Sequence, residues 1–422
     1  MKLIHTSTRG SRAKLERLFV RRNLAYDGAL PVAQRIISAV RKGGDAALRR
    51  YAQSLDGITA QSQLRISPEE LSAAWSAASP DLKSALQTAA RNIRAFAQRQ
   101  LPKEWTLAPV PGLSVGQIIR PLDAVGCYVP GGRYPLPSTL LMTVIPAQVA
   151  GVPRIAVTSP RPAPETLAAA AMLGVTEFYR MGGAHAIAAL AYGTESISPV
   201  DKIAGPGNAY VTAAKKLVAF DCAIDMLAGP TEIVVTSKTG NPRWIAADLV
   251  AQAEHDPDAL TVFITISDTL ARSVLAEVKQ QVRSNAIARE AIRSNGYAIV
   301  ARSAEEAHDI TNRLAPEHLT VDTESDLVWV RNAGSVFIGP HSAQPLGDYI
   351  SGPNHTLPTA GLARVRGSLS VSDFLKVVTV QQYALAAVQK LGPAAVALAE
   401  AEGLHGHAAA IRARLEDPPC LS

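Results

Sequence analysis

Short strand-like segments alternate with helix-like segments from about residue 153 onward, and this alternation constrains the fold more than any other feature. The apolar, β-branched runs are residues 155–158, 177–181, 202–204, 232–237, 260–266, 298–301, 318–321 and 335–338. Most are followed by apolar residues at helical spacing, as in residues 164–173 and 242–254. Strands that alternate with helices form parallel sheets, since the chain must cross back over the sheet between parallel neighbours. We therefore predict an α/β fold.

A chain of 422 residues, 47 % of them hydrophobic, can bury more than one core. The net charge is +6, but no nucleic-acid recognition module accompanies it, so we expect no nucleic-acid partner. Apolar runs are too short to cross a membrane, and the first 22 residues contain no run long enough for a signal peptide. Three scattered cysteines are typical of a reducing compartment. We therefore expect a cytoplasmic protein without membrane association.

Histidines are concentrated late in the chain, mostly beside an acidic or amide residue. Seven of the nine follow residue 250. The clusters are Gln252 to His255, Glu317-His318, Asp348 to His355, and Glu402 with His405 and His407. Imidazole nitrogens with carboxyl and amide oxygens are ligands of a divalent metal such as zinc, and the same groups act as general acids and bases. The pattern favours an enzyme.

Two of these clusters also have a structural explanation. Gln252 and His255 are three residues apart near a helix end, so they lie on one face and could share a ligand. A helix end exposed to solvent, without any ligand, would show the same residues. Glu317 and His318 lie at a loop-to-strand junction, where His318 could accept a proton and Glu317 could activate water. A surface glutamate beside a half-buried histidine explains this pair equally well.

The remaining candidates lie in loops and at the end of the chain. Asp348 and His355 belong to a Gly/Pro-rich segment, residues 339–362, and long loops of this kind are usually functional or disordered. A glycine-rich turn at residues 205–208 lies between a strand and a helix, where backbone N–H groups can meet a phosphate. A second, at residues 128–132, is equally ambiguous, because a structural turn explains it well. Neither has the full dinucleotide fingerprint, so the nucleotide signal is weak.

Eight motifs together make the chain resemble the histidinol dehydrogenase family. In chain order they are GCYVPGG, IAGPGNAYVTAAK, DMLAGPTE, DLVAQAEHDP, APEHL, LGDYISGPNHTLPT, LSVSDF and EGLHGH. They extend from about residue 120 to residue 410, whereas the first hundred residues match only loosely.

The resemblance implies a role for each motif residue. It places zinc ligands at Gln252, His255, Asp348 and His407, which leaves His405 without a role. It places the catalytic pair at Glu317 and His318. Substrate contacts are implied at the four ligands and at His318, Thr231, His355 and Glu402, and cofactor contacts at Tyr128, His185 and Asn208. One Zn²⁺ per subunit and NAD⁺ would serve the oxidation of L-histidinol, via L-histidinaldehyde, to L-histidine.

The resemblance also implies the domain organisation. We expect two Rossmann-like parallel-sheet domains with helices on both faces, a helical N-terminal region and a small C-terminal helical arm. Residues 1–120 with 233–375 would form a discontinuous catalytic domain, and residues 121–232 an inserted cofactor-binding domain. The arm, residues 376–422, would reach the active site of the partner subunit, so a homodimer with shared sites is implied.

Three positions depart from the usual family pattern. His185 stands where glutamine is usual, Thr231 where serine is usual, and Pro353 where threonine is usual. These departures keep open a diverged relative that oxidises another alcohol, such as a sulfonated diol. A metal-dependent hydrolase would use the same ligand types. A non-catalytic α/β protein with solvated clusters is a further alternative.

Overall fold

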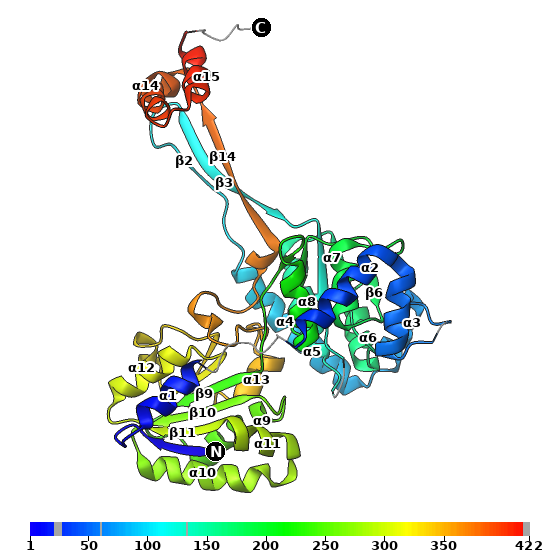
Figure 1. The fold of residues 1–422 in the computed structure, drawn as a ribbon, viewed down its shortest axis with the longest axis vertical. Coiled ribbons are helices and arrows are strands. Elements are labelled where there is room, and N and C mark those ends of the chain that lie inside the picture. The colour runs from blue at the N-terminus through cyan, green and yellow to red at the C-terminus, as the bar shows by residue number, and fades with distance from the viewer. Residues whose placement is uncertain (21–27, 60, 132–133, 417–422) are drawn as a thin grey trace. The chain divides into compact units, whose positions relative to one another are not determined.

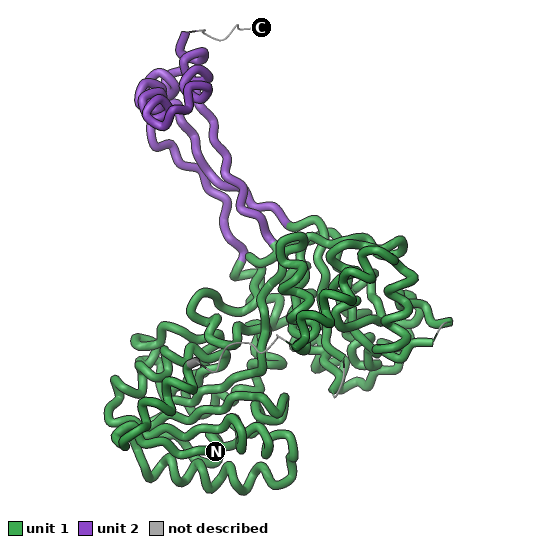
Figure 2. The backbone as a smooth tube through the Cα atoms, viewed as in Figure 1, with its two compact units in different colours: residues 1–100, 122–374 green, residues 101–121, 375–422 purple. Residues whose placement is uncertain are grey.

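The computed structural model describes residues 1–20, 28–59, 61–131 and 134–416. The chain divides into two compact units (Figure 2). Unit 1 comprises Met1–Gln100 and Leu122–Phe374, and unit 2 comprises Leu101–Pro121 and Leu375–Ser422. Unit 1 contains two all-parallel sheets covered by helices, which confirms the predicted α/β fold (Figure 1). No helix within the described ranges is both long and apolar enough to span a membrane.

The first sheet of unit 1 has five strands in the order β6-β5-β4-β7-β8. The strands are β4 (Ala124–Tyr128), β5 (Arg154–Thr158), β6 (Glu177–Tyr179), β7 (Lys202–Ala204) and β8 (Ala223–Ile224). The connecting helices are α5 (Pro137–Ala150), α6 (Pro164–Met172), α7 (Gly183–Tyr192) and α8 (Ala209–Val218). In chain order the strands run 3-2-1-4-5, which is the arrangement of a Rossmann-like sheet.

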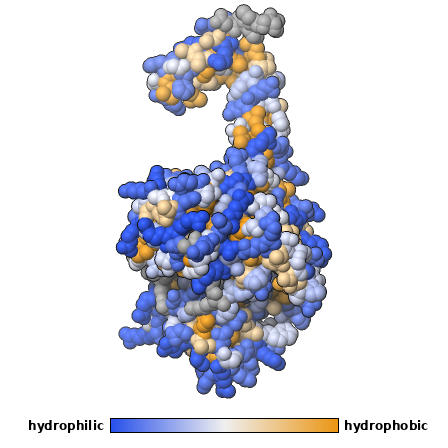
Figure 3. Space-filling model, turned by 90° about the vertical axis from the view of Figure 1, so that its right-hand side faces the viewer, coloured by the Kyte–Doolittle hydropathy of each residue, from blue (hydrophilic) through white to orange (hydrophobic). Residues whose placement is uncertain are grey.

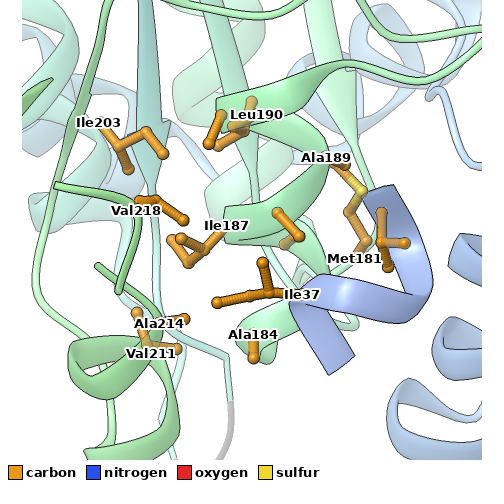
Figure 4. Close-up of a cluster of buried hydrophobic side chains, with 14 of the residues drawn as sticks. Ile37, Met181, Ala184, Ile187, Ala189, Leu190, Ile203, Val211, Ala214 and Val218 are labelled. Atoms are coloured by element: carbon orange, nitrogen blue, oxygen red, sulfur yellow. The ribbon is translucent and has the colours of Figure 1, made fainter. Parts of the chain in front are cut away.

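The helical N-terminal region packs on this five-stranded sheet. It contains α2 (Leu30–Tyr51), the π-helix η1 (Ala52–Asp56), α3 (Pro68–Ala77) and α4 (Pro80–Arg99). Helix α2 packs against α7 and α8, whereas α3 and α4 pack against α6 and α5. Ile37 of α2 lies among Ile187 and Val218 in the cluster that joins the three helices (Figure 4). Burial of each such aliphatic side chain contributes about 1.5–3 kcal/mol.

The second sheet of unit 1 has six strands in the order β1-β11-β10-β9-β12-β13. The strands are β1 (Lys2–His5), β9 (Glu232–Thr236), β10 (Leu260–Thr265), β11 (Gly296–Val300), β12 (His318–Val321) and β13 (Ser335–Ile338). Its helices and short turns are α1 (Ser11–Val20), α9 (Pro242–Ala253), α10 (Asp268–Gln281), η2 (Val282–Ser284), α11 (Ala286–Asn295), α12 (Ala304–Leu314), η3 (Glu324–Val328), α13 (Gln344–Tyr349), η4 (Leu362–Arg364) and η5 (Val371–Phe374). Helices α9, α10 and α11 share one buried cluster, and α1 and α12 share another. Apart from β1, the strand order is again 3-2-1-4-5.

Unit 2 is an antiparallel ribbon with two helices. Strand β3 (Leu113–Pro121) pairs with β14 (Leu375–Tyr383) on one side and with β2 (Trp105–Leu107) on the other. Helices α14 (Leu385–Ala401) and α15 (His405–Glu416) pack against each other. The predicted domain boundaries remain a prediction, although residues 101–121 belong with the C-terminal segment rather than with residues 1–100.

Several elements differ from the sequence-based expectation. Strands β1 and β14 and helix α11 were not expected, and α13 lies within the segment expected to be an irregular loop. Strand β14 pairs with residues more than 250 positions earlier, and a local pattern cannot indicate so distant a partner. Strand β1 is a four-residue edge strand that depends on β11 for its hydrogen bonds.

Candidate active site

The Glu317-His318 pair lies at the amino-terminal edge of the six-stranded sheet. His318 is the first residue of β12 and aligns with Ile233 near the start of β9. Thr231 and Glu232, at the start of β9, are therefore its neighbours. Glu317 is 7 % exposed and His318 is 3 % exposed, which excludes the alternative of a surface glutamate beside a half-buried histidine.

The imidazole of His318 has one nitrogen fixed by the backbone. Nδ1 lies 3.1 Å from the carbonyl oxygen of Glu232 and donates its proton there, because a carbonyl only accepts. Nε2 lies 3.4 Å from Asp348 Oδ1 and has no hydrogen-bond partner among the described residues. Burial lowers the pKa of His318, but the Glu317 and Asp348 carboxylates outweigh this effect and raise it overall. Nε2 is thus the nitrogen able to accept a proton.

The carboxyl group of Glu317 is held by two donors. Its Oε2 accepts hydrogen bonds from the Thr231 hydroxyl at 2.6 Å and from the Glu232 backbone N–H at 2.8 Å. Burial raises the pKa of Glu317 to about 7, even though His318 and these two donors favour the charged form. A carboxyl group with this pKa can exchange protons near neutral pH.

Gln252 connects to the same group through Thr231. Its Nε2 donates to the Thr231 hydroxyl, so the chain of hydrogen bonds runs from Gln252 through Thr231 to Glu317. The carbonyl oxygen Oε1 of Gln252 is buried and has no partner in the part of the chain that is described. A buried acceptor of this kind fits a metal ion, since an amide oxygen is a zinc ligand by chemistry.

Asp348 and His355 come from the segment after β13 and face His318. Asp348 Oδ2 accepts from Gln344 at 2.8 Å, and the Asp348 carbonyl lies 2.7 Å from His355 Nδ1. Burial raises the pKa of Asp348, but the nearby imidazoles lower it overall. His318, Asp348 and His355 line one cavity of about 410 Å³ along β13.

His255 is close enough to His355 for its charge to affect the pKa of His355, whereas the predicted site residues Glu402 and His407 belong to unit 2. Burial lowers the pKa of His355, and among the smaller contributions are the charges of His318 and His255. His255 follows the last turn of α9 and is exposed. His407 in α15 and Glu402 at the end of α14 are exposed, and His405 pairs with Glu400.

The described residues contain no group of three or more His, Cys, Asp or Glu side chains arranged to hold a metal ion. The predicted ligand set contains a glutamine and draws His407 from unit 2. Within unit 1, only two members of that set, His255 and Asp348, are His, Cys, Asp or Glu residues. They are too few to form such a group by themselves. The donors nevertheless fit zinc by type, because all four are nitrogen or oxygen ligands.

Two of the predicted cofactor residues lie together at the carboxyl edge of the five-stranded sheet. Tyr128 ends β4, and its hydroxyl accepts the backbone N–H of Gly183 at 3.1 Å. His185 in the first turn of α7 is buried, and its Nε2 lies 2.8 Å from Asp56 Oδ2. Burial raises the pKa of Tyr128 well above its ordinary value.

The third predicted cofactor residue, Asn208, caps helix α8. Its Oδ1 accepts the backbone N–H groups of Tyr210 and Val211, both at 3.1 Å, which leaves its amide nitrogen for other contacts. The preceding turn is held by a buried ion pair, because Asp225 Oδ2 accepts the Gly205 N–H at 2.8 Å and Lys215 donates to the Gly205 carbonyl at 2.9 Å. Gly205 has φ +117°, a conformation that favours glycine.

Sequence reasoning missed four residues that shape these sites. Asn354 is buried and donates to the Met142 carbonyl at 2.6 Å. Asp56, Lys215 and Asp225 are buried charged residues beside the predicted cofactor contacts. Only Asn354, Lys215 and Asp225 lie within the quoted motifs; Asp56 carries no local signal, because its partner is 129 residues away.

These features define an α/β enzyme with a buried acid–base pair and a separate glycine-turn site. The family model for histidinol dehydrogenase matches residues 20–415. Histidinol dehydrogenase of Methanothermobacter thermautotrophicus is 46 % identical, covering 96 % of this chain and 97 % of the relative. That of Moorella thermoacetica is 47 % identical, covering 96 % and 98 %.

A solved structure agrees with these sequence matches. The crystal structure of histidinol dehydrogenase from Elizabethkingia anophelis is 35 % identical with a TM-score of 0.93, covering 99 % of this chain and 98 % of that one. The chain belongs to the histidinol dehydrogenase family, which confirms the resemblance seen in its motifs.

Proposed function

We propose that this chain oxidises L-histidinol, through L-histidinaldehyde, to L-histidine in the cytoplasm, with two NAD⁺ and one Zn²⁺ per subunit. The observation that carries the proposal is the buried Glu317-His318 pair, which lies beside Asp348 and His355 in a chain of this family. The first oxidation removes a hydride and a proton from the alcohol. The second removes them from the aldehyde hydrate, so one water enters and two NADH leave.

The proposed zinc ligands are Gln252, His255, Asp348 and His407. The Oε1 atom of Gln252, which has no partner among the residues that the structure describes, and the position of Asp348 beside His318 support this set from within unit 1. When bound, zinc would supply a Lewis acid that fixes the substrate's imidazole and amine, and NAD⁺ would accept the hydride.

His318 accepts the alcohol proton on Nε2. Its Nδ1 proton is held by the Glu232 carbonyl, so the ring can rotate little and Nε2 stays aimed at the cavity. Glu317, in its deprotonated carboxylate form, then accepts a proton from the water that attacks the aldehyde. Because its pKa is about 7, turnover of the aldehyde should rise with pH through about 7 and level off above it.

Thr231, His355 and Glu402 are the further proposed substrate contacts, and Tyr128, His185 and Asn208 the proposed cofactor contacts. The hydroxyl of Thr231 already donates to Glu317 and accepts from Gln252, so its role is to orient these two groups. His355 Nε2 lies 3.4 Å from the Thr139 hydroxyl and lines the same cavity as His318.

A homodimer with shared sites is the proposed assembly, in which His407 and Glu402 of unit 2 serve the active site of the partner subunit, as the family resemblance implies. Exposed apolar side chains of unit 2 support a protein partner, because apolar groups of this size gain by leaving water. They include Trp105, Leu107, Val377, Val380, Leu398 and Leu404, and apolar surface is visible on this unit in Figure 3. His407→Ala and Asp348→Ala, each inactive alone, should regain activity when co-expressed. A mixed dimer without recovery would contradict the shared site.

The decisive experiment counts NADH formed per L-histidinol consumed by zinc-loaded protein, with a chelator control. Two NADH per substrate, lost with chelator, is the expected result. One NADH would mean an alcohol dehydrogenase that stops at the aldehyde. No NADH from histidinol, with NADH from another alcohol such as a sulfonated diol, would show a diverged relative. Turnover of an ester or amide without NADH would indicate a hydrolase.

A further inference from the structure

A buried histidine–aspartate pair lies beside the glycine turn that begins α7. His185 Nε2 and Asp56 Oδ2 are 2.8 Å apart, and their side chains are 1 % and 8 % exposed. Asp56 is the last residue of the π-helix η1, and π-helical turns are frequent at functional sites. The ring of Tyr51 stacks on His185 with a centroid distance of 6.2 Å. The imidazole is thus fixed on one face by an aromatic ring and on one edge by a carboxylate.

The same carboxylate also holds the turn. Asp56 Oδ2 accepts the Gly182 backbone N–H at 2.8 Å, and Tyr128 holds the next N–H, that of Gly183. Gly183 has φ +57°, and a Cβ on Gly182 would collide with the ring of Pro160. Two successive N–H groups at the start of α7 therefore have fixed directions, and Asp56 joins them to His185.

The proton positions on His185 follow from its partner. A carboxylate only accepts hydrogen bonds, so Nε2 carries the proton that binds Asp56. Nδ1 is buried and has no partner among the described residues. A Cβ built on Gly183 would lie 3.4 Å from Nδ1, so this nitrogen faces the turn that begins α7. A buried polar atom without a partner is unfavourable, and a donor on a bound ligand would satisfy it.

We propose that Asp56 is a positioning residue of the cofactor site, which holds the proton of His185 on Nε2 so that Nδ1 accepts an N–H or O–H of NAD⁺. The proposal rests on the proposed use of NAD⁺. The glutamine usual at this position offers both a donor and an acceptor without such a partner. His185 offers an acceptor alone, and only while Asp56 fixes its tautomer.

A double-mutant cycle on the dissociation constant of NAD⁺ tests the coupling. Asp56→Asn should weaken binding to the zinc-loaded protein about tenfold, because an amide can donate to Nε2 and move the ring proton to Nδ1. In the His185→Gln background the same change should cost less than about threefold, since glutamine needs no fixed tautomer. Equal losses in both backgrounds would overturn the proposal.

Asp268→Asn is the matched control. It removes the carboxylate of a half-exposed pair, His5 with Asp268 at 3.3 Å, on the six-stranded sheet. It should leave the NAD⁺ dissociation constant unchanged. A loss equal to that of Asp56→Asn would mean a general effect of removing a carboxylate beside histidine, and would overturn the proposal.

The second readout needs no cofactor. Nitrogen-15 NMR of protein labelled at histidine, with the His185 signal assigned by its absence in His185→Gln, should show a protonated Nε2 and an unprotonated Nδ1. A protonated Nδ1 in the unaltered protein would overturn the acceptor role. Wild-type protein that binds no NAD⁺ would instead refute the proposed function itself, which the binding measurement distinguishes from a failure of the cycle.

Discussion

The two parallel sheets of unit 1 share one strand order but carry their candidate site residues at opposite edges. In the five-stranded sheet, Tyr128 and the turn before α8 lie at the carboxyl ends of β4 and β7. In the six-stranded sheet, Glu232 and His318 lie at the amino ends of β9 and β12. In both sheets the candidate residues lie at the ends of the same central pair of strands, since β4 and β7 correspond in the strand order to β9 and β12.

The helix termini at each edge explain the difference. Helices α7 and α8 begin at the carboxyl edge, where the positive end of the helix dipole suits the phosphates of a dinucleotide. Helix α9 ends at the amino edge of the other sheet, so Gln252 and His255 lie at the negative end of its dipole. That environment suits a cation. One topology can therefore serve an anionic cofactor at one edge and a metal at the other.

The largest expected effect is at the amino edge of the six-stranded sheet. His318→Asn should lower turnover of L-histidinol by about 10²–10⁴-fold, because it removes the proton acceptor from the cavity. Bound zinc, measured by metal analysis, should not change, since His318 is not among the proposed ligands. Unaltered turnover would show that His318 is not the proton acceptor, and would contradict the assignment of acid–base chemistry to the amino edge.

A large effect on stability is expected at the carboxyl edge of the five-stranded sheet. Lys215→Met should lower the free energy of unfolding by about 3–5 kcal/mol, because it leaves Asp225 buried without its opposite charge. Urea unfolding gives this value, and NAD⁺ binding should weaken as the Gly205 turn loosens. Arg293→Met, which breaks the exposed pair with Glu290, is the control and should leave the free energy of unfolding nearly unchanged. Equal losses would mean that burial of the ion pair is unimportant.

Thr231 lies between Gln252, a proposed metal ligand, and Glu317 of the proposed acid–base pair. Thr231→Ala should cost about 1–3 kcal/mol of stability, because Gln252 and Glu317 each lose a hydrogen bond to its hydroxyl. The apparent pKa of the aldehyde step should also rise, since the hydroxyl favours the charged form of Glu317. Thr231→Ser retains both hydrogen bonds and should keep the pH profile of the unaltered protein. A shifted profile in the serine variant would show that the methyl group matters.

The smallest effect is expected at the carboxyl edge of the six-stranded sheet. Asn241 caps α9 by accepting the Arg243 N–H at 2.9 Å, and Asn241→Ala should cost about 1 kcal/mol in thermal unfolding. Turnover should not change, because this end of α9 is opposite to the end that bears Gln252. A loss of turnover larger than the loss of stability would place chemistry at both edges of this sheet.

Local sequence patterns predicted much of unit 1, whereas in unit 2 the helical character of the C-terminal arm was expected but its strand pairing was not. Strands β5, β9 and β10 and helices α6 and α9 follow the predicted ranges closely, since their apolar spacing and flanking turn residues are local signals. Strand β14 and the grouping of residues 101–121 with the C-terminal segment were not predicted. Their partners are far apart along the chain, so no window of sequence contains both.

The sequence by itself determined the α/β class and the family, because both depend on residue order and spacing. It also indicated Glu317 and His318 as a candidate catalytic pair, but a surface glutamate beside a half-buried histidine explained the same residues equally well. Only the tertiary structure decided that both are buried, that Nε2 of His318 has no hydrogen-bond partner within the described ranges, and that Asp56 holds His185. Burial and proton position arise from neighbours such as Glu232 and Asp56, which packing brings together across the chain.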